Sequence, residues 1–115
     1  YEDDDVIAIL DIAQTTYGHT LVMPKKHYEN ILECPKEELY KVISVTQDLA
    51  NKIMVNLGAK GMNILTNTNE VSGQSVPHLH FHIIPRYEEN DSIKIEFTTN
   101  EFDLDEIKNK IDANK

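Results

Sequence analysis

Hydrophobic residues recur at three- and four-residue steps between Pro35 and Leu57, which predicts a long amphipathic helix. Pro35 suits the first turn of this helix, because its fixed φ is already helical and its missing N–H would have no partner there. Gly58 suits the end, because glycine readily adopts the left-handed conformation that closes a helix. The face that should pack on a core comprises Leu39, Val42, Ile43, Thr46, Leu49, Ala50, Ile53 and Leu57.

Short apolar runs bounded by polar residues, glycine or proline predict strands on both sides of the helix. Two apolar runs precede the helix, at 6–10 and 19–23. The polar connection between them is long, as loops that carry functional residues often are. A third strand is expected at 61–67 and a fourth at 76–84, ended by a proline. An alternating stretch at 93–97 predicts a short edge strand.

The last part of the chain predicts a second, shorter helix. Asp103 followed three residues later by Glu106 resembles a capping box at a helix start. Leu104, Ile107 and Ile111 then share one helical face.

Composition narrows the classes of partner. The chain has 115 residues, which fits one domain, and a net charge of −9 without a long basic run. This argues against a nucleic-acid polymer or an anionic membrane as partner, although a few local donors could still hold a small anion.

Cys34 is the single cysteine, so an internal disulfide is impossible and a reducing compartment is expected. The chain starts at Tyr1 without a methionine, and we expect a further N-terminal segment before it.

Three of the five histidines are concentrated in residues 75–85, which read SVPHLHFHIIP. In a strand, side chains alternate between faces, and neighbours on one face are roughly 6.5–7 Å apart. We therefore expect His78, His80 and His82 to line one groove, while the apolar residues between them face the core.

Such a histidine row has three interpretations: an exposed strand that is rich in histidine, a metal site, or a phosphate site. Two histidines at alternate positions can share zinc if other ligands join them. Imidazole also serves as a nucleophile, acid and hydrogen-bond donor toward phosphate. Gly73, Gln74 and Ser75 offer neutral donors just before the row, and no Asp or Glu lies within it, which favours phosphate.

Residues 73–84, GQSVPHLHFHII, resemble the signature of the histidine triad (HIT) superfamily. Residues 18–27, GHTLVMPKKH, are similar to a second segment of that family, and residues 9–11 and Asn67 stand at family-like spacings. The resemblance extends over residues 1–87 and is closest to the bacterial Hit and Hint-like branch.

The resemblance implies an α+β fold, with a mostly antiparallel sheet of about five strands, one long helix packed on it and a short C-terminal helix. It implies a single HIT domain over residues 1–115, in a cytoplasmic homodimer whose two sheets join. It further implies a purine nucleotide as substrate, with hydrolysis at its α-phosphorus, and no required cofactor.

The resemblance also assigns catalytic roles. His80 would attack phosphorus and form a nucleotidyl-histidine intermediate, which splits one difficult displacement into two easier ones. A carbonyl group on one nitrogen of its ring would fix the tautomer and leave the other lone pair free. His82 would hold phosphate oxygens, and His19 and His78 would support the triad and its proton traffic.

The remaining site residues implied by the resemblance bind the nucleotide. Asp11 would accept the ribose hydroxyls, Ile9 would flank the base and Asn67 would contact the phosphate or sugar. Ser75 would hold phosphate oxygens, and the amide of Gln74 would lie near the leaving group.

Many bacterial relatives bind structural zinc through a Cys-x-x-Cys pair and two histidines that match His27 and His78. This chain has no such pair, and two histidines alone fall short of the four ligands of a structural zinc site, so zinc is expected only if an N-terminal segment supplies the cysteines. The leading function is hydrolysis or nucleotidyl transfer from nucleoside phosphoramidates or other nucleoside 5′-monophosphate conjugates. The alternatives are a dinucleoside polyphosphate hydrolase, a nucleotide-binding or regulatory module with weak activity, and a metal-binding protein that uses the three histidines directly.

Overall fold

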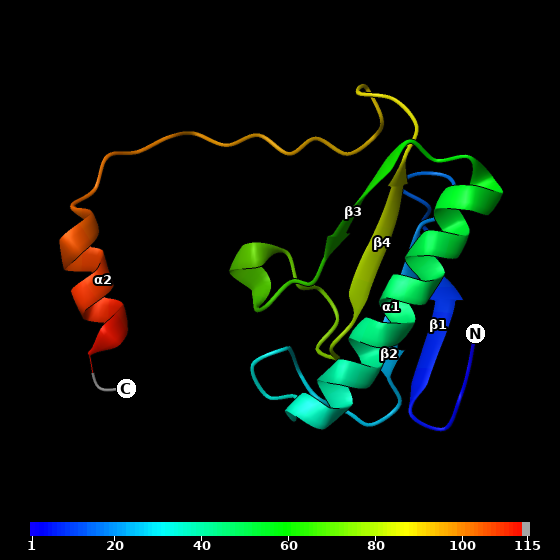
Figure 1. Cartoon of the computed structure of the whole chain (residues 1–115), viewed down its shortest axis with the longest axis horizontal. Coiled ribbons are helices and arrows are strands. Elements are labelled where there is room, and N and C mark those ends of the chain that lie inside the picture. The colour runs from blue at the N-terminus through cyan, green and yellow to red at the C-terminus, as the bar shows by residue number, and fades with distance from the viewer. Residues whose placement is uncertain (114–115) are drawn as a thin grey trace.

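The computed structural model of the chain describes residues 1–113, with an antiparallel sheet, one long helix packed on it and a short C-terminal helix (Figure 1). In chain order the elements are β1 (Val6–Leu10), β2 (Thr20–Pro24), α1 (Lys36–Leu57), β3 (Gly61–Leu65), the 3-10 turn η1 (Glu70–Ser72), β4 (Phe81–Arg86) and α2 (Leu104–Asp112). The predicted α+β class is confirmed.

The sheet has the strand order β1-β2-β4-β3, and every neighbouring pair is antiparallel. Helix α1 covers one of its faces (Figure 1). Pairing places Ala8 opposite Val22 and Val22 opposite Phe81, so one row of buried side chains crosses three strands beneath the helix. Val42 and Val45 of α1 close the core from above. Neither helix of residues 1–113 covers the opposite face of the sheet (Figure 1).

Helix α1 ends as the sequence predicts but buries only part of its predicted face. Pro35 precedes its first residue, and Gly58 closes it in the left-handed conformation with a φ of 70°. Thr46 is buried because its hydroxyl donates to the Val42 carbonyl, 2.7 Å away. Ile43, which we expected in the core, is 48% exposed, so part of the apolar face is left uncovered by the described residues.

Two strand predictions are wrong. The fourth strand begins at Phe81 instead of Val76, since Pro77 has no N–H to pair and the N–H of Leu79 donates to the carbonyl of Tyr28 outside the sheet. Residues 93–97 form no strand, because they lead away from the sheet and an alternating pattern becomes a strand only where a partner strand pairs with it. The sheet of the described residues therefore has four strands instead of about five.

The C-terminal helix forms where it was predicted. The Asp103 carboxylate accepts hydrogen bonds from the backbone N–H groups of Asp105 and Glu106 and so caps α2. Figure 1 shows α2 standing clear of the sheet at the end of an extended segment. Neither helix of the described residues has the length and apolar character needed to cross a bilayer.

Candidate active site

Two histidines lie side by side on the open face of the sheet. Phe81 and Ile83 of β4 are buried beneath α1, so strand alternation turns His82 to the opposite face. His80 lies immediately before β4, and the ring centroids of His80 and His82 are 4.9 Å apart. The two imidazoles form a compact pair that a single ligand group could contact.

The tautomer of His80 follows from one hydrogen bond. Its Nδ1 lies 2.7 Å from the carbonyl oxygen of His78, and a carbonyl oxygen can only accept, so Nδ1 carries the proton. In the neutral ring the lone pair is therefore on Nε2. The Thr66 hydroxyl donates to the carbonyl of His80 at 2.7 Å and holds the backbone of that residue. The chain thus presents a basic nitrogen with a defined orientation.

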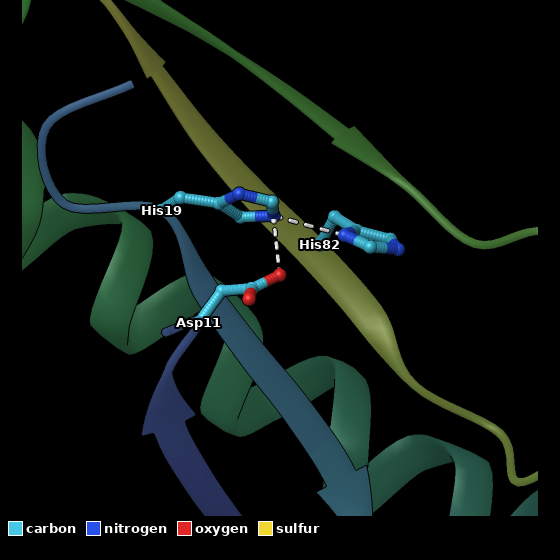
Figure 2. A group of neighbouring side chains, drawn as sticks. All are labelled: Asp11, His19 and His82. Carbon is cyan, nitrogen blue, oxygen red and sulfur yellow. Dashed lines mark hydrogen bonds and ion pairs between the residues drawn. The ribbon is translucent and has the colours of Figure 1, made fainter. Parts of the chain in front are cut away.

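His82 is oriented by a second chain of hydrogen bonds. The backbone N–H of Thr15 donates to Nδ1 of His19 at 3.3 Å, so the proton of the neutral His19 ring is on Nε2. This Nε2 lies 2.9 Å from Nδ1 of His82 and donates to it (Figure 2). The proton of neutral His82 is then on its own Nε2. A lone pair on His80 and an N–H on His82 are consequently the groups that remain for a ligand.

Asp11 completes this group of side chains. Its Oδ2 lies 3.7 Å from Nε2 of His19 (Figure 2). Its Oδ1 accepts from the backbone N–H of Ala13. The loop between β1 and β2 is held by Gln14, whose side-chain oxygen accepts from the backbone N–H groups of Gly18 and His19. The sequence did not point to Gln14, because the sequence of a polar loop does not show whether a side chain bonds to the loop backbone or to solvent.

Burial keeps the imidazoles of His19 and His82 neutral. The pKa of His82 is lowered from 6.5 to about 4, chiefly because burial disfavours its charged form and also because His80 and His19 lie close by, while Asp11 acts in the opposite direction. Burial likewise lowers the pKa of His19, again opposed by Asp11. At neutral pH His19 and His82 therefore offer hydrogen bonds and no positive charge.

The expectation that all three histidines line one groove is wrong for His78. Because β4 starts at Phe81, His78 lies outside the strand and its ring turns away from the pair. Its Nε2 donates to the carbonyl of Pro24 at 2.9 Å, and its Nδ1 lies 3.0 Å from Nδ1 of His27. His78 contacts His80 through its backbone carbonyl, not through its imidazole.

The predicted phosphate-binding loop residues lie in the segment before β4. The side-chain oxygen of Gln74 accepts from the backbone N–H of Asn69, and its amide nitrogen donates to the carbonyls of Glu29 and Val76. Its amide is therefore committed to holding the loop. Ser75 is exposed and lines a cavity of about 230 Å³ that also contains Glu29 and Glu70, which is unfavourable for an anion. The side chain of Asn67 is partly buried beside Gly73.

An apolar row leads from β1 to the histidine pair. Strand pairing places Ile9 opposite Leu21, Leu21 opposite His82 and His82 opposite Leu65. Paired residues share one face of a sheet, so this row lies on the same face as His82. Ile9 is 49% exposed, as a flat ligand would require. Leu21 and Leu65 were missed, because only the pairing of the strands brings them beside His82.

The described residues contain one cluster of three possible metal ligands, formed by Asp11, His19 and His82. The direct hydrogen bond between the two histidines already accounts for this arrangement, and His78 and His80 are outside it. Among the described residues the three triad histidines therefore do not gather as one set of metal ligands. At His27 and His78 two Nδ1 atoms converge as two zinc ligands would, with the Nε2–H of His78 anchored on a carbonyl. Residues 1–113 gather no third ligand there, so the pair fits only half of a structural zinc site.

Comparison with known proteins agrees with the resemblance found in the sequence. The family model described as HIT domain matches residues 1–89. An uncharacterized HIT-like protein of Methanocaldococcus jannaschii is 44% identical over 111 residues, which cover 96% of this chain and 85% of the relative. The adenylylsulfatase HINT3 of Arabidopsis thaliana is 38% identical over 88 residues, covering 76% of this chain and 45% of the relative.

Solved structures agree with the sequence relatives. A crystal structure of a HIT family member from Bacillus subtilis matches with a TM-score of 0.93 and 38% identity, over 100% of this chain and 85% of that chain. A zinc-bound histidine triad family protein from Mycobacterium smegmatis matches with a TM-score of 0.73 and 37% identity, over 78% of this chain and 66% of that chain.

Proposed function

Because the chain belongs to the HIT domain family, whose proteins are of the nucleotide-binding and hydrolase type, we propose that it is a nucleotide hydrolase or nucleotidyl transferase. Its substrates are purine nucleoside phosphoramidates or other nucleoside 5′-monophosphate conjugates, and the reaction takes place at the α-phosphorus. The relative named an adenylylsulfatase supports a conjugate of this kind.

The observation that carries this proposal is the pair of complementary nitrogens on the open face of the sheet. Nε2 of His80 has a free lone pair because Nδ1–H donates to the His78 carbonyl. Nε2 of His82 has a hydrogen because Nδ1 accepts from His19. With the rings 4.9 Å apart, one nitrogen attacks phosphorus while the other donates to an oxygen on the same phosphorus.

The reaction proceeds in two displacements. In the first, Nε2 of His80 forms a bond to the α-phosphorus and the bond to the leaving group breaks; a leaving amine takes up one proton from water. In the second, water attacks the α-phosphorus, the nitrogen–phosphorus bond breaks and the water releases one proton. Nδ1–H of His80 stays bonded to the His78 carbonyl in both steps, and neutral His82 donates to a phosphate oxygen.

The nucleotide lies along the apolar row. The purine packs on Ile9 and its neighbour Leu21, while the ribose hydroxyls donate to Asp11, whose Oδ2 faces the site. Leu65 lies on the other side of His82. His19 acts as a positioning residue that holds His82 through its Nε2–H.

The loop residues have supporting roles. His78 fixes the nucleophile through its carbonyl, and Gln74 holds the loop that carries the leaving-group side. The proposed contacts of Ser75 with phosphate and of Asn67 with phosphate or sugar rest on the family resemblance, and the carboxylates of Glu29 and Glu70 beside Ser75 oppose the first of them.

The rest of the proposal concerns the assembly. The chain works in the cytoplasm as a homodimer in which the free edge of β3 brings two sheets together. Hydrolysis requires no cofactor, since nucleophile and donors are all side chains. Zinc at His27 and His78, as in a zinc-bound relative, would be structural and would need two further ligands.

A substrate panel with two variants tests the function. His80→Ala and His80→Asn should each lower kcat at least about 1,000-fold while nucleotide binding by calorimetry changes little, because the lost group acts only in bond formation. Lys52→Ala, on the exposed face of α1, serves as control.

The panel contains adenosine 5′-phosphoramidate, adenylyl sulfate and diadenosine polyphosphates. Preference for the first two supports the proposal, and preference for the polyphosphates supports the alternative hydrolase. Tight nucleotide binding with no turnover of any of them would indicate a binding module. Turnover by His80→Ala at the parent rate would show that the nucleophile is misassigned.

A further inference from the structure

Gln14, in the loop between β1 and β2, directs its whole side-chain amide at the backbone. Its oxygen accepts from the N–H groups of Gly18 at 2.8 Å and His19 at 3.1 Å. Its nitrogen donates to the carbonyls of Asp11 at 2.5 Å and His19 at 2.8 Å. A primary amide has two N–H donors and two acceptor lone pairs, so all four are used. Gln14 is exposed, so water could satisfy the same atoms, and burial does not explain these four bonds.

The four partners determine which end of the amide faces which group. Backbone N–H groups only donate and carbonyls only accept, so the oxygen must face Gly18 and the nitrogen must face Asp11. Glutamate has the length of glutamine, but when ionised it has no donor for the carbonyls. Asparagine has both kinds of atom and is one methylene shorter. Among straight side chains of this length, only glutamine can therefore make all four bonds.

The bonded backbone groups lie at the two ends of the loop. Pairing of β1 with β2 stops one residue before Asp11 and one residue after His19, and the N–H of Asp11 then donates to the carbonyl of His19 at 3.0 Å. Gln14 adds a second donor to that carbonyl and a bond to the carbonyl of Asp11. The N–H of His19 is shared between the Gln14 oxygen and the carbonyl of Thr16, each at 3.1 Å. The spacing of the two loop ends therefore depends on the Gln14 amide.

The far part of the loop is anchored without Gln14. The Thr16 hydroxyl donates to the carbonyl of Pro85 at 2.6 Å, in a buried position. The Tyr87 hydroxyl donates to the carbonyl of Tyr17 at 2.6 Å. Both bonds attach the middle of the loop to the end of β4. Loss of the Gln14 amide should therefore loosen the ends of the loop without unfolding the rest.

Each end of the loop carries a group of the candidate active site. Oδ2 of Asp11 lies 3.7 Å from Nε2 of His19, and that nitrogen lies 2.9 Å from Nδ1 of His82 (Figure 2). Hydrogen bonds weaken steeply when donor and acceptor are no longer aligned. A shift of the His19 backbone would therefore release the His82 ring.

We propose that Gln14 is a positioning residue whose amide fixes Asp11 and His19 relative to each other, so that the ribose acceptor and the phosphate donor His82 are presented at one spacing. This rests on the function proposed above. It adds that recognition of the ribose and orientation of His82 depend on one side chain. Because a displacement of about 1 Å away from the reacting atoms can cost about 100-fold in rate, the amide should affect kcat as well as KM.

Steady-state kinetics of Gln14→Ala with matched nucleotides tests this role. On adenosine 5′-phosphoramidate, kcat should fall at least about tenfold. The ratio of KM for the 2′-deoxy analogue to KM for the ribonucleotide should fall at least about threefold, because Asp11 is no longer fixed. Asn56→Ala removes an exposed amide from α1 and should change neither quantity more than about twofold. Lower thermal stability with both quantities unchanged would show a structural role only, and would overturn the proposal.

Nuclear magnetic resonance supplies a readout that needs no substrate. In the ¹⁵N-labelled parent, a nitrogen–nitrogen coupling should be detected across the hydrogen bond between Nε2 of His19 and Nδ1 of His82. In Gln14→Ala this coupling should fall at least about twofold, while Asn56→Ala keeps the parent value. An unchanged coupling in Gln14→Ala would overturn the proposal.

Gln14→Glu serves if the alanine variant does not fold by circular dichroism. It keeps the length and the oxygen that accepts from Gly18, and it lacks the donors to Asp11 and His19. It should also reduce ribose discrimination and weaken the coupling, and parental values of both would refute the role of the amide.

Failure of the proposed function is recognised separately. If the parent hydrolyses no substrate of the panel, the proposed function is wrong. The coupling between His19 and His82 in the Gln14 variants still decides whether the amide positions His19.

Discussion

Acidification from pH 7 to pH 4 should destabilise the protein through His82. In the folded chain His82 has a pKa of about 4, because it is buried and lies beside His80 and His19. In the unfolded chain its pKa returns to 6.5. Between these values the unfolded state holds more protons than the folded state, so the free energy of unfolding falls as the pH falls through this window, and the effect ends below about pH 4.

The magnitude follows from the size of the shift. A fully buried group with this difference would contribute about 3 kcal/mol, and because His82 is partly open to solvent we expect about 2 kcal/mol. His82→Asn removes the titrating ring and keeps an oxygen that can accept from His19. The free energy of unfolding of the parent should therefore fall by about 2 kcal/mol more than that of the variant between pH 7 and pH 4.

Urea unfolding at fixed protein concentration measures this difference, and carboxylates such as Asp91 that lose their hydrogen bonds in acid affect both proteins alike. A nuclear magnetic resonance titration of the imidazole protons checks the cause, since the His82 ring should stay neutral at pH 5. Equal pH dependence in parent and variant, or titration of His82 near pH 6.5, would refute the burial and hydrogen bonding assigned to this ring.

Three further substitutions have expected outcomes. Thr66→Val should lower kcat about tenfold through loosening of the His80 backbone, with Thr66→Ser restoring it; unchanged kcat in steady-state assays would count against this role. Asp11→Asn should raise KM about tenfold for ribonucleotide substrates and less for their 2′-deoxy analogues, and an equal effect on both would argue against ribose binding. Gly18→Ala should cost about 2 kcal/mol in thermal or urea unfolding, because Gly18 has a φ of +96° and the added methyl would meet the Leu57 side chain; a neutral result would contradict the left-handed backbone.

The fold could be predicted where local pattern and tertiary packing agree. The residues from Pro35 to Gly58 predict α1 because periodicity, start and stop signals are consistent. Periodicity cannot show whether an apolar face is completely covered. It therefore could not show that Ile43, which we expected in the core, is exposed. The pattern at 93–97 failed for a related reason, since alternation gives a strand only if another strand is available to pair.

In the candidate site, too, the local sequence predicts some features and long-range packing decides the others. The triad spacing identifies a histidine-rich segment, but long-range contacts decide which rings meet. His19 reaches His82 across 63 residues, and His27 reaches His78 across 51. The resemblance led us to expect a carbonyl on the His80 ring, and the structure identifies it as that of His78, two residues earlier in the chain.

The most direct test is to trap the covalent intermediate and locate its bond. Acid-free rapid quenching of the parent with adenosine 5′-phosphoramidate, followed by peptide mass spectrometry, should show one adenylyl group on His80. Phosphorus–nitrogen coupling with ¹⁵N-labelled histidine should then assign the bond to Nε2, because Nδ1 is occupied by its hydrogen bond to the His78 carbonyl. An adduct on Nδ1 or on another residue, or turnover with none formed during the burst, would contradict the proposed mechanism.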